Sequence, residues 1–166
     1  MIYADRQIME LLREQGVIRP WTLERVQPAS YDLTLGNVLK RWHKDEWMEF
    51  RIPYEGYELP RGELLLFSTA EYVMLPDDIA ARVEGKSSIG RRGLFIHVTA
   101  GWIDPGFQGE ITLEMYAVGP TPVRVMPGMA ICQIAFMQCT GPAARAYGHA
   151  ELGSKYQGQT GVTEAR

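Results

Sequence analysis

The feature that most constrains the fold is a series of short segments in which apolar and polar residues alternate. The clearest are YDLTLGNVLKRW, GELLLFSTAEYVML, GEITLEMYAV, PVRVM and MAICQIAFMQC. A period of two is typical of β-strands, because successive side chains point to opposite faces of a sheet. Most of the 10 prolines and 17 glycines fall between these segments, where turns belong. We therefore expect a small, mainly β sandwich or barrel.

One short helix is expected near the start of the chain. In DRQIMELLREQG, Asp5 can cap the helix, Ile8, Leu11 and Leu12 share one face, and Gly16 ends it. No repeat, linker or low-complexity segment divides the 166 residues, and 46% of them are hydrophobic. That content suffices for one core, so a single domain over residues 1–166 is predicted.

Charge and cysteine content limit the possible partners. A net charge of −3 argues against a protein that coats nucleic acid polymers, which would need a basic face, but it leaves a single nucleotide open. The two cysteines, Cys132 and Cys139, are too few for a disulfide framework and fit a reducing compartment. The N-terminal MIYADRQIMELL has acids where a signal peptide is apolar, and no run of about 18 apolar residues occurs. We expect a cytoplasmic protein without membrane contact.

The segment EGKSSIGRRG combines hydroxyls, cations and glycines, as a polyphosphate site requires. It is not a Walker A loop, because Ala80 stands where that motif needs its first glycine. Lys86, Ser87, Ser88 and Arg91 are close enough in the chain to converge on one anion. Taken alone, the segment is explained more simply as a solvated basic turn without a ligand.

The strand GEITLEMY is expected to have one apolar and one polar face. Alternation places Ile111, Leu113 and Met115 on the first face and Glu110, Thr112, Glu114 and Tyr116 on the second. A glutamate on a polar face usually meets water. If that face lines a pocket beside the phosphate donors, Glu114 becomes a partly desolvated carboxylate suited to proton transfer.

The segment HVTAGWIDPGF holds two further polar candidates. Asp104 precedes a Pro-Gly turn, so it either shapes the hairpin as an Asx-turn acid or binds a sugar hydroxyl or a water. His97 stands alone among apolar neighbours, which favours a structural role over metal ligation. Zinc deaminases carry H-x-E and P-C-x-x-C, and neither occurs here, so that mechanism is excluded and no metal site is expected on the protein.

The tail GHAELGSKYQGQTGVTEAR, residues 148–166, is small and polar. Termini of this composition are usually mobile. Its glycines, lysine and glutamines also suit a lid that orders over a ligand. Composition alone leaves both interpretations open.

Four motifs, GKSSIGR, HVTAGWIDPGF, GEITLE and SKYQGQTG, occur in an order and spacing that resemble the dCTP deaminase family. VQPASYDLTLGN is similar to the family's opening strand, so the resemblance covers nearly the whole chain. It implies a homotrimeric, dUTPase-like distorted β-barrel or jelly-roll-like β-sandwich with one short N-terminal helix. It also implies that residues 148–166 form a mobile lid on the single domain.

The resemblance further implies hydrolytic deamination of dCTP at cytosine C4 without zinc, with Mg²⁺ carried by the triphosphate. Glu114 corresponds to the glutamate that activates water, and Asp104 to a residue that contacts the deoxyribose. The phosphate-binding candidates are Lys86, Ser87, Ser88, Ile89, Gly90, Arg91, Gln133, Tyr147, Lys155 and Gln159, and backbone at Ala100, Thr112 and Leu113 would read the base. dCTP and dUTP are the implied ligands, with dTTP as a candidate inhibitor.

Some members of that family release dUTP, and others also remove diphosphate to give dUMP. Ala100 and Gly101 resemble the dUMP-forming pattern, in which a small residue leaves room for a hydrolytic water near the α-phosphate. We therefore expect dUMP as the product. The alternatives are a deaminase that stops at dUTP, a plain dUTPase, which needs no deaminating carboxylate, and a non-catalytic nucleotide-binding regulator. The segment from Arg41 to Pro60 is shorter than in many relatives, and AVGPTPV replaces their asparagine-bearing turn.

Overall fold

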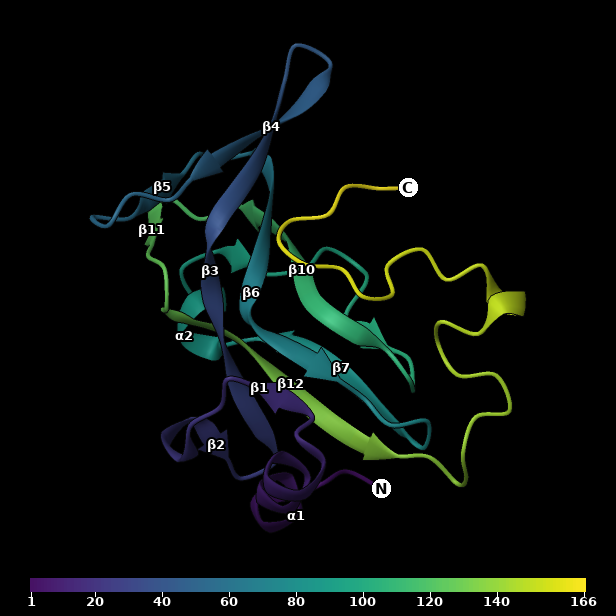
Figure 1. The fold of residues 1–166 in the computed structure, drawn as a ribbon. Coiled ribbons are helices and arrows are strands. Elements are labelled where there is room, and N and C mark those ends of the chain that lie inside the picture. Colours follow the sequence, from purple (N-terminus) through teal and green to yellow (C-terminus); the bar gives the residue numbers. More distant parts are fainter.

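The computed structural model describes residues 1–166, and strands dominate it (Figure 1). The strands are β1 (Ile18–Arg19), β2 (Val26–Gln27), β3 (Ser30–His43), β4 (Glu46–Arg51), β5 (Tyr57–Leu59), β6 (Leu64–Met74), β7 (Ile79–Gly85), β8 (Leu94–Phe95), β9 (Trp102–Ile103), β10 (Gln108–Ala117), β11 (Val123–Val125) and β12 (Ala130–Gln138). Ten of them form one antiparallel sheet with the main order β8-β10-β6-β3-β12-β7-β9, and β5 pairs with β11. The mainly β prediction is confirmed.

The sheet is organised around β3. The first half of this strand pairs with β12, where Thr34 faces Ala130, and the second half pairs with β6 and β4, where Leu39 faces Phe67 and Phe50. Its register against β6 shifts between Leu35 and Leu39. At this irregularity a Cβ on Gly36 would lie 2.9 Å from Ser68 Oγ, so the glycine permits the close approach of the two strands. β3 therefore joins the two halves of a curled sheet.

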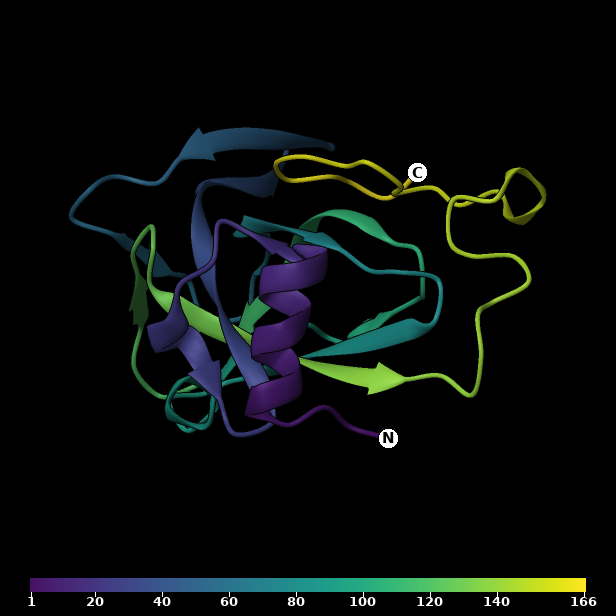
Figure 2. The same ribbon diagram turned by 60° about the horizontal axis from the view of Figure 1, so that its bottom comes forward.

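The expected helix is present and packs on the core (Figure 2). α1 (Asp5–Glu10) continues as a π-helical segment, Leu11–Gln15, which ends at Gly16 with a left-handed φ of 62°. The side chains of Ile8, Leu11 and Leu12 are buried, as predicted. The remaining helical segments are α2 (Ser87–Gly90) and two 3₁₀ turns at Leu23–Arg25 and Ala150–Leu152. None of these helices has the length and apolar character needed to cross a membrane.

The predicted cap at Asp5 is wrong. Asp5 is the first helical residue, and the residue before the helix is Ala4. The backbone N–H of Ala4 donates to Oε1 of Gln7 at 3.2 Å, while the Asp5 carboxylate accepts from the backbone N–H of Arg6. The helix therefore begins one residue earlier than a capping role for Asp5 requires, and Asp5 instead places its negative charge in the first turn.

Five predicted strand segments are confirmed as β3, β6, β10, β11 and β12. The other seven strands were not predicted, and β7 is the longest of them. The reason is its burial pattern. Ile79, Ala80 and Ala81 are all buried in succession, so the strand starts with an apolar run that covers both faces. Such a strand lacks the alternation by which the others were identified.

A buried carboxylate connects β6 to β3. The register between β10 and β6 shifts where Thr69, Ala70 and Glu71 of β6 stand opposite Ile111 alone. Glu71 is fully buried and accepts hydrogen bonds from Arg25 Nη1 at 2.8 Å, from the Thr34 N–H at 2.8 Å and from Thr34 Oγ1 at 2.7 Å. These donors offset the cost of removing the charge from water.

Both cysteines are free, as the sequence predicts. Cys132 of β12 is buried, and burial, followed by the negative charges of Glu71 and Asp32, raises the pKa of its thiol. Cys132 therefore stays protonated at neutral pH and behaves as a small apolar side chain.

Candidate active site

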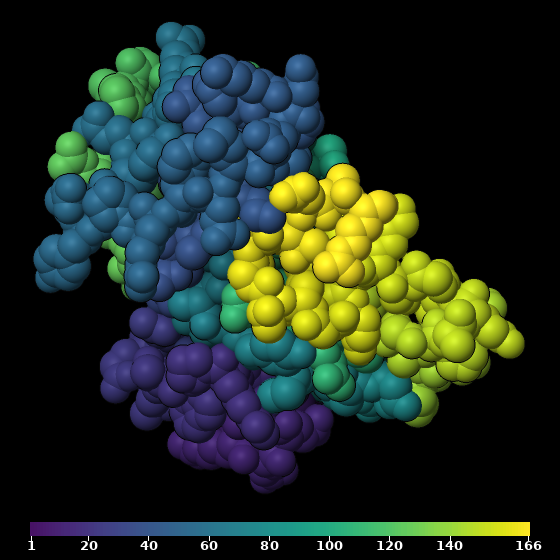
Figure 3. All heavy atoms as spheres, turned by 45° about the horizontal axis from the view of Figure 1, so that its top comes forward, coloured from purple at the N-terminus to yellow at the C-terminus, as the bar shows by residue number.

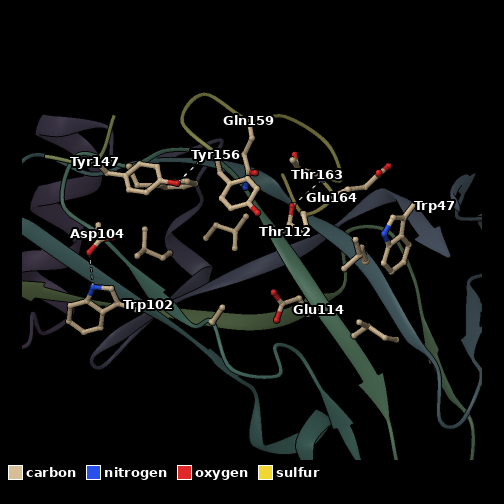
Figure 4. Close-up of a pocket in the computed structure, with 17 residues that line it drawn as sticks. Trp47, Trp102, Asp104, Thr112, Glu114, Tyr147, Tyr156, Gln159, Thr163 and Glu164 are labelled. Carbon is tan, nitrogen blue, oxygen red and sulfur yellow. Dashed lines mark hydrogen bonds between the residues drawn. The ribbon is translucent and has the colours of Figure 1, made fainter. Parts of the chain in front are cut away.

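A cleft of about 400 Å³ opens between β10 and the segment that contains β9 (Figure 4). Six residues predicted from the sequence line it together: Ala100, Asp104, Thr112, Glu114, Tyr147 and Gln159. The aliphatic side chains of Leu64 and Leu66 from β6 and the indole of Trp47 from β4 complete the wall. The cleft thus gathers acids, hydroxyls and amides on a largely apolar surface.

Glu114 points into the middle of this cleft (Figure 4). The position follows from the strand, because β10 buries Leu113 and Met115 on its other face. The Glu114 side chain is half-buried and forms no ion pair; its Oε2 lies 3.4 Å from the backbone N of Val98, which donates to it. A carboxylate without a cation partner remains free to accept a proton from a group bound in the cleft.

Asp104 is held by a neighbour that the sequence analysis missed. The indole Nε1 of Trp102 donates to Asp104 Oδ1 at 3.0 Å. The predicted turn exists, since the Phe107 N–H donates to the Asp104 carbonyl at 3.2 Å, but the carboxylate binds the indole rather than the turn backbone. The two residues are separated by two positions, so their side chains share a face of the extended segment, and this spacing could have identified Trp102.

Gly101 lies against His97. A Cβ at Gly101 would stand 2.7 Å from the Val83 carbonyl oxygen and 2.9 Å from both Cε1 and Nε2 of the imidazole. His97 is half-buried, and its Nδ1 is buried without a hydrogen-bond partner. The glycine therefore allows the histidine to pack closely beside the cleft wall.

The tail runs along β10 and supplies part of the cleft wall. It lies on the surface of the molecule (Figure 3). Gln159 exchanges hydrogen bonds with the backbone of Glu110, through the Glu110 N–H at 3.0 Å and through its own Nε2 at 2.7 Å. The Gly161 N–H donates to Glu110 Oε2 at 2.7 Å, and the Thr163 N–H donates to Thr112 Oγ1 at 3.2 Å. Glu110, which was not a predicted site residue, thus anchors the tail.

Two further tail contacts lie at the ends of this segment. Lys40 Nζ of β3 pairs with Glu164 Oε1 at 2.8 Å. Lys155 does not line the cleft, and its Nζ donates to the Arg166 carbonyl at 2.5 Å. To contact a phosphate as predicted, the Lys155 side chain would therefore have to leave the Arg166 carbonyl and turn toward the cleft.

The main group of phosphate-binding candidates lies outside the cleft. Lys86 precedes α2, the side chains of Ser87, Ser88 and Arg91 are exposed around it, and Gln133 lies beside Gly85. None of these lines the cleft that holds Glu114. The side chain of Ile89 is buried in the core, so Ile89 and likewise Leu113 can offer only backbone groups to a ligand.

The predicted alternation of β10 holds except at Ile111. Ile111 packs against the core but also lines the cleft, because the register shift against β6 falls at this residue. The structure contains no group of three or more histidine, cysteine, aspartate or glutamate side chains placed to hold a metal ion.

Comparison with known proteins shows the family and the fold. The dCTP deaminase-like family matches residues 2–139. A dUMP-forming dCTP deaminase of Bifidobacterium adolescentis is 43% identical, over 100% of this chain and 94% of the relative. The crystal structure of the 2'-deoxycytidine 5'-triphosphate deaminase of Agrobacterium tumefaciens superposes with a TM-score of 0.70 at 26% identity, over 81% of this chain and 47% of that chain. A phage 80alpha dUTPase shares the fold, with a TM-score of 0.50 at 14% identity over 72% of this chain and 82% of that chain.

Replacing Glu110 with alanine tests the anchoring of the tail. The variant removes the acceptor of the Gly161 N–H, so we expect the amides of Gly161 and Thr163 to exchange hydrogen about tenfold faster than in the wild type. Glu151→Ala, which removes only an exposed contact with Arg145, is the matched control. Equal exchange in all three proteins would contradict this anchor.

Proposed function

The chain belongs to the dCTP deaminase-like family, and we propose that it converts dCTP to dUMP by removing ammonia from cytosine C4 and then releasing diphosphate. The observation that carries the proposal is the position of Glu114, a half-buried carboxylate without an ion pair in the middle of the cleft. The name of the 43% identical relative supports dUMP as the product.

In the proposed deamination, Glu114 takes a proton from water, and the hydroxide adds to C4 of cytosine. The carboxylate gives this first proton to N3 of the ring. It then takes the proton of the new C4 hydroxyl and passes it to the amino group, and the C4–N bond breaks as the C4 carbonyl forms, so that water and dCTP become dUTP and ammonia. A positioned acid–base group of this kind typically contributes about 10²- to 10⁴-fold in rate. The apolar walls at Leu64 and Leu66 limit competing water around the carboxylate.

We assign the recognition of base and sugar to the same cleft. Backbone groups at Ala100, Thr112 and Leu113 would read the edge of the base. The bond from Trp102 fixes one oxygen of Asp104, so the other can accept from the deoxyribose hydroxyl or orient the water that attacks the α-phosphate. Tyr147 and Gln159 also line the cleft, and we assign them to the phosphates.

We further propose a homotrimer in which the phosphate donors of one subunit face the cleft of another. This proposal is supported by the exposure of Ser87, Ser88 and Arg91, none of which lines the cleft of its own subunit. Residues 148–166 would act as the lid of the single domain, with Lys155 turning to the phosphates on closure.

The proposed substrates of the protein are small nucleotides, so we propose a cytoplasmic enzyme.

Mg²⁺ is proposed to enter with the triphosphate. The chain offers no cluster of three metal-ligating side chains, whereas Mg²⁺ binds readily to phosphate oxygens and water. When bound, the ion would neutralise phosphate charge, which the side chains of Lys86 and Arg91 would also do. The deamination is assigned to Glu114 without zinc, and dTTP is retained as a candidate inhibitor because it shares the triphosphate.

Product analysis tests the proposed function directly. The protein is incubated with dCTP and Mg²⁺, and ammonia, dUTP and dUMP are measured over time. Equal amounts of ammonia and dUMP are expected. Accumulation of dUTP would identify a deaminase that stops after the first step, and hydrolysis of added dUTP without ammonia from dCTP would identify a plain dUTPase.

Glu114→Gln should abolish deamination while nucleotide binding persists. The amide cannot accept a proton from water, so we expect ammonia release to fall at least about 10³-fold. Glu58→Gln, which changes an exposed glutamate on β5, serves as the control. Near-normal ammonia release by the Glu114 variant would reject this residue as the base.

Gly101→Val should separate the two reactions. The new side chain would meet Val83 and His97 and narrow the space for the second water, so dUTP is expected to replace dUMP as the main product. Gly141→Val is the matched control, because nothing lies within 4 Å of a Cβ at Gly141. An unchanged ratio of dUMP to dUTP would show that Gly101 does not determine the product.

A further inference from the structure

We propose that the buried polar face of β3 positions the phosphate-binding segment, with Asp32 as the positioning residue for Lys86. The inference rests on the proposed function, because it takes Lys86 and Gln133 to be phosphate ligands. Asp32 itself is not assigned a contact with substrate. Its action would pass entirely through the lysine.

β3 is unusual in burying polar side chains on one face. Tyr31, Leu33 and Leu35 alternate toward the core, while Ser30, Asp32 and Thr34 point the other way and are only 8%, 7% and 2% exposed. A strand buried on both faces normally carries apolar residues throughout. Polar groups in such positions are destabilising unless hydrogen bonds satisfy them.

Each of these three polar side chains has a partner on a different strand or turn. Ser30 Oγ donates to Gln133 Oε1 at 2.8 Å, Asp32 Oδ2 pairs with Lys86 Nζ, and Thr34 Oγ1 donates to Glu71 at 2.7 Å. Two of the three partners, Lys86 and Gln133, are phosphate-binding candidates. The third, Glu71, belongs to the buried network that joins β3 and β6.

The first two contacts converge on one turn. Gln133 of β12 stands directly opposite Asp32 in the register, and its Nε2 donates to the Gly85 carbonyl at 3.4 Å. Lys86 follows Gly85 and immediately precedes α2, which contains Ser87 and Ser88. β3 therefore fixes both the strand end and the lysine from which the phosphate-binding segment begins.

Lys86 needs such a partner because its side chain is long and flexible. An unrestrained lysine would lose rotamer freedom on binding a phosphate, which weakens the interaction. An ammonium has three N–H donors, and Asp32 occupies one of them, so two remain for phosphate oxygens. Asp32 Oδ1 is buried and has no partner, which leaves the contact with Lys86 as the only side-chain bond of this carboxylate.

The negative charge of Asp32 also has an opposite effect, since it would repel a triphosphate. The two effects predict opposite changes in phosphate affinity when the charge is removed. If Asp32 positions Lys86, removing its charge weakens phosphate binding; if its charge acts alone, the same change tightens binding. The sign of the change in affinity therefore decides between them.

The test compares Asp32→Asn with Thr34→Val in the full chain. Thr34→Val removes the hydroxyl that donates to Glu71, whereas Asp32→Asn removes the ion pair with Lys86 and leaves at most a neutral hydrogen bond. Only Asp32→Asn touches a phosphate-binding candidate. For Asp32→Asn we expect the KM for dCTP and the Kd for inorganic tripolyphosphate to rise about tenfold, with kcat within about twofold of wild type. Thr34→Val should leave this KM and this Kd unchanged but should unfold at a lower denaturant concentration.

Two further variants separate positioning from charge and folding. Asp32→Glu keeps the charge but displaces the carboxylate, so it should also weaken tripolyphosphate binding. In a Lys86→Met background, Asp32→Asn should have no additional effect on Kd, because the lysine through which Asp32 acts is gone. An additional loss of similar size in that background would overturn the proposal.

The outcomes also distinguish this inference from the proposed function. Unchanged or tighter tripolyphosphate binding by Asp32→Asn overturns the positioning role even if the enzyme releases ammonia normally. The converse outcome is also informative. If the wild-type protein binds tripolyphosphate, Asp32→Asn weakens that binding, and no ammonia is released from dCTP, the deaminase proposal is overturned and the positioning role is supported.

Discussion

The structure depends on β3, a strand that is paired on both edges and whose first half, residues 30–35, is buried on both faces. On one edge it pairs with β6, which leads to β10 and Glu114; on the other it pairs with β12, which leads to β7 and α2. Its apolar face supplies part of the core. Its polar face has to be satisfied by hydrogen bonds, and these bonds hold Glu71 in the sheet and Lys86 at the start of the proposed phosphate-binding segment.

This arrangement explains why acids and phosphate donors occur close together in the sequence. Glu114 and Asp104 meet in one cleft, while Ser87 and Arg91 are exposed elsewhere on the same chain. In the proposed reaction, a carboxylate can therefore serve the base and sugar without neutralising the cations that would bind the triphosphate. The separation is consistent with a site that a neighbouring subunit completes, as the proposed homotrimer requires.

Much of this could be predicted from local sequence. Alternation identified β10 and the orientation of Glu114, because each residue's face follows from its strand position. The predicted capping role of Asp5 was wrong, because the residue at which a helix begins depends on backbone geometry that one side chain does not determine. The contacts of Glu110 with Gly161 and of Asp32 with Lys86 were missed because they join residues far apart in the chain. Only the tertiary pairing of strands reveals them.

The most direct test of the shared site mixes two inactive variants. Glu114→Gln and Arg91→Ala subunits are combined in equal amounts, dissociated and reassembled, and ammonia release from dCTP is compared with that of each variant alone. If two subunits build each site, random assembly restores an intact pair of residues in about one site in four, and activity should return accordingly. Mixed assemblies that remain as inactive as the separate variants would contradict a site divided between subunits.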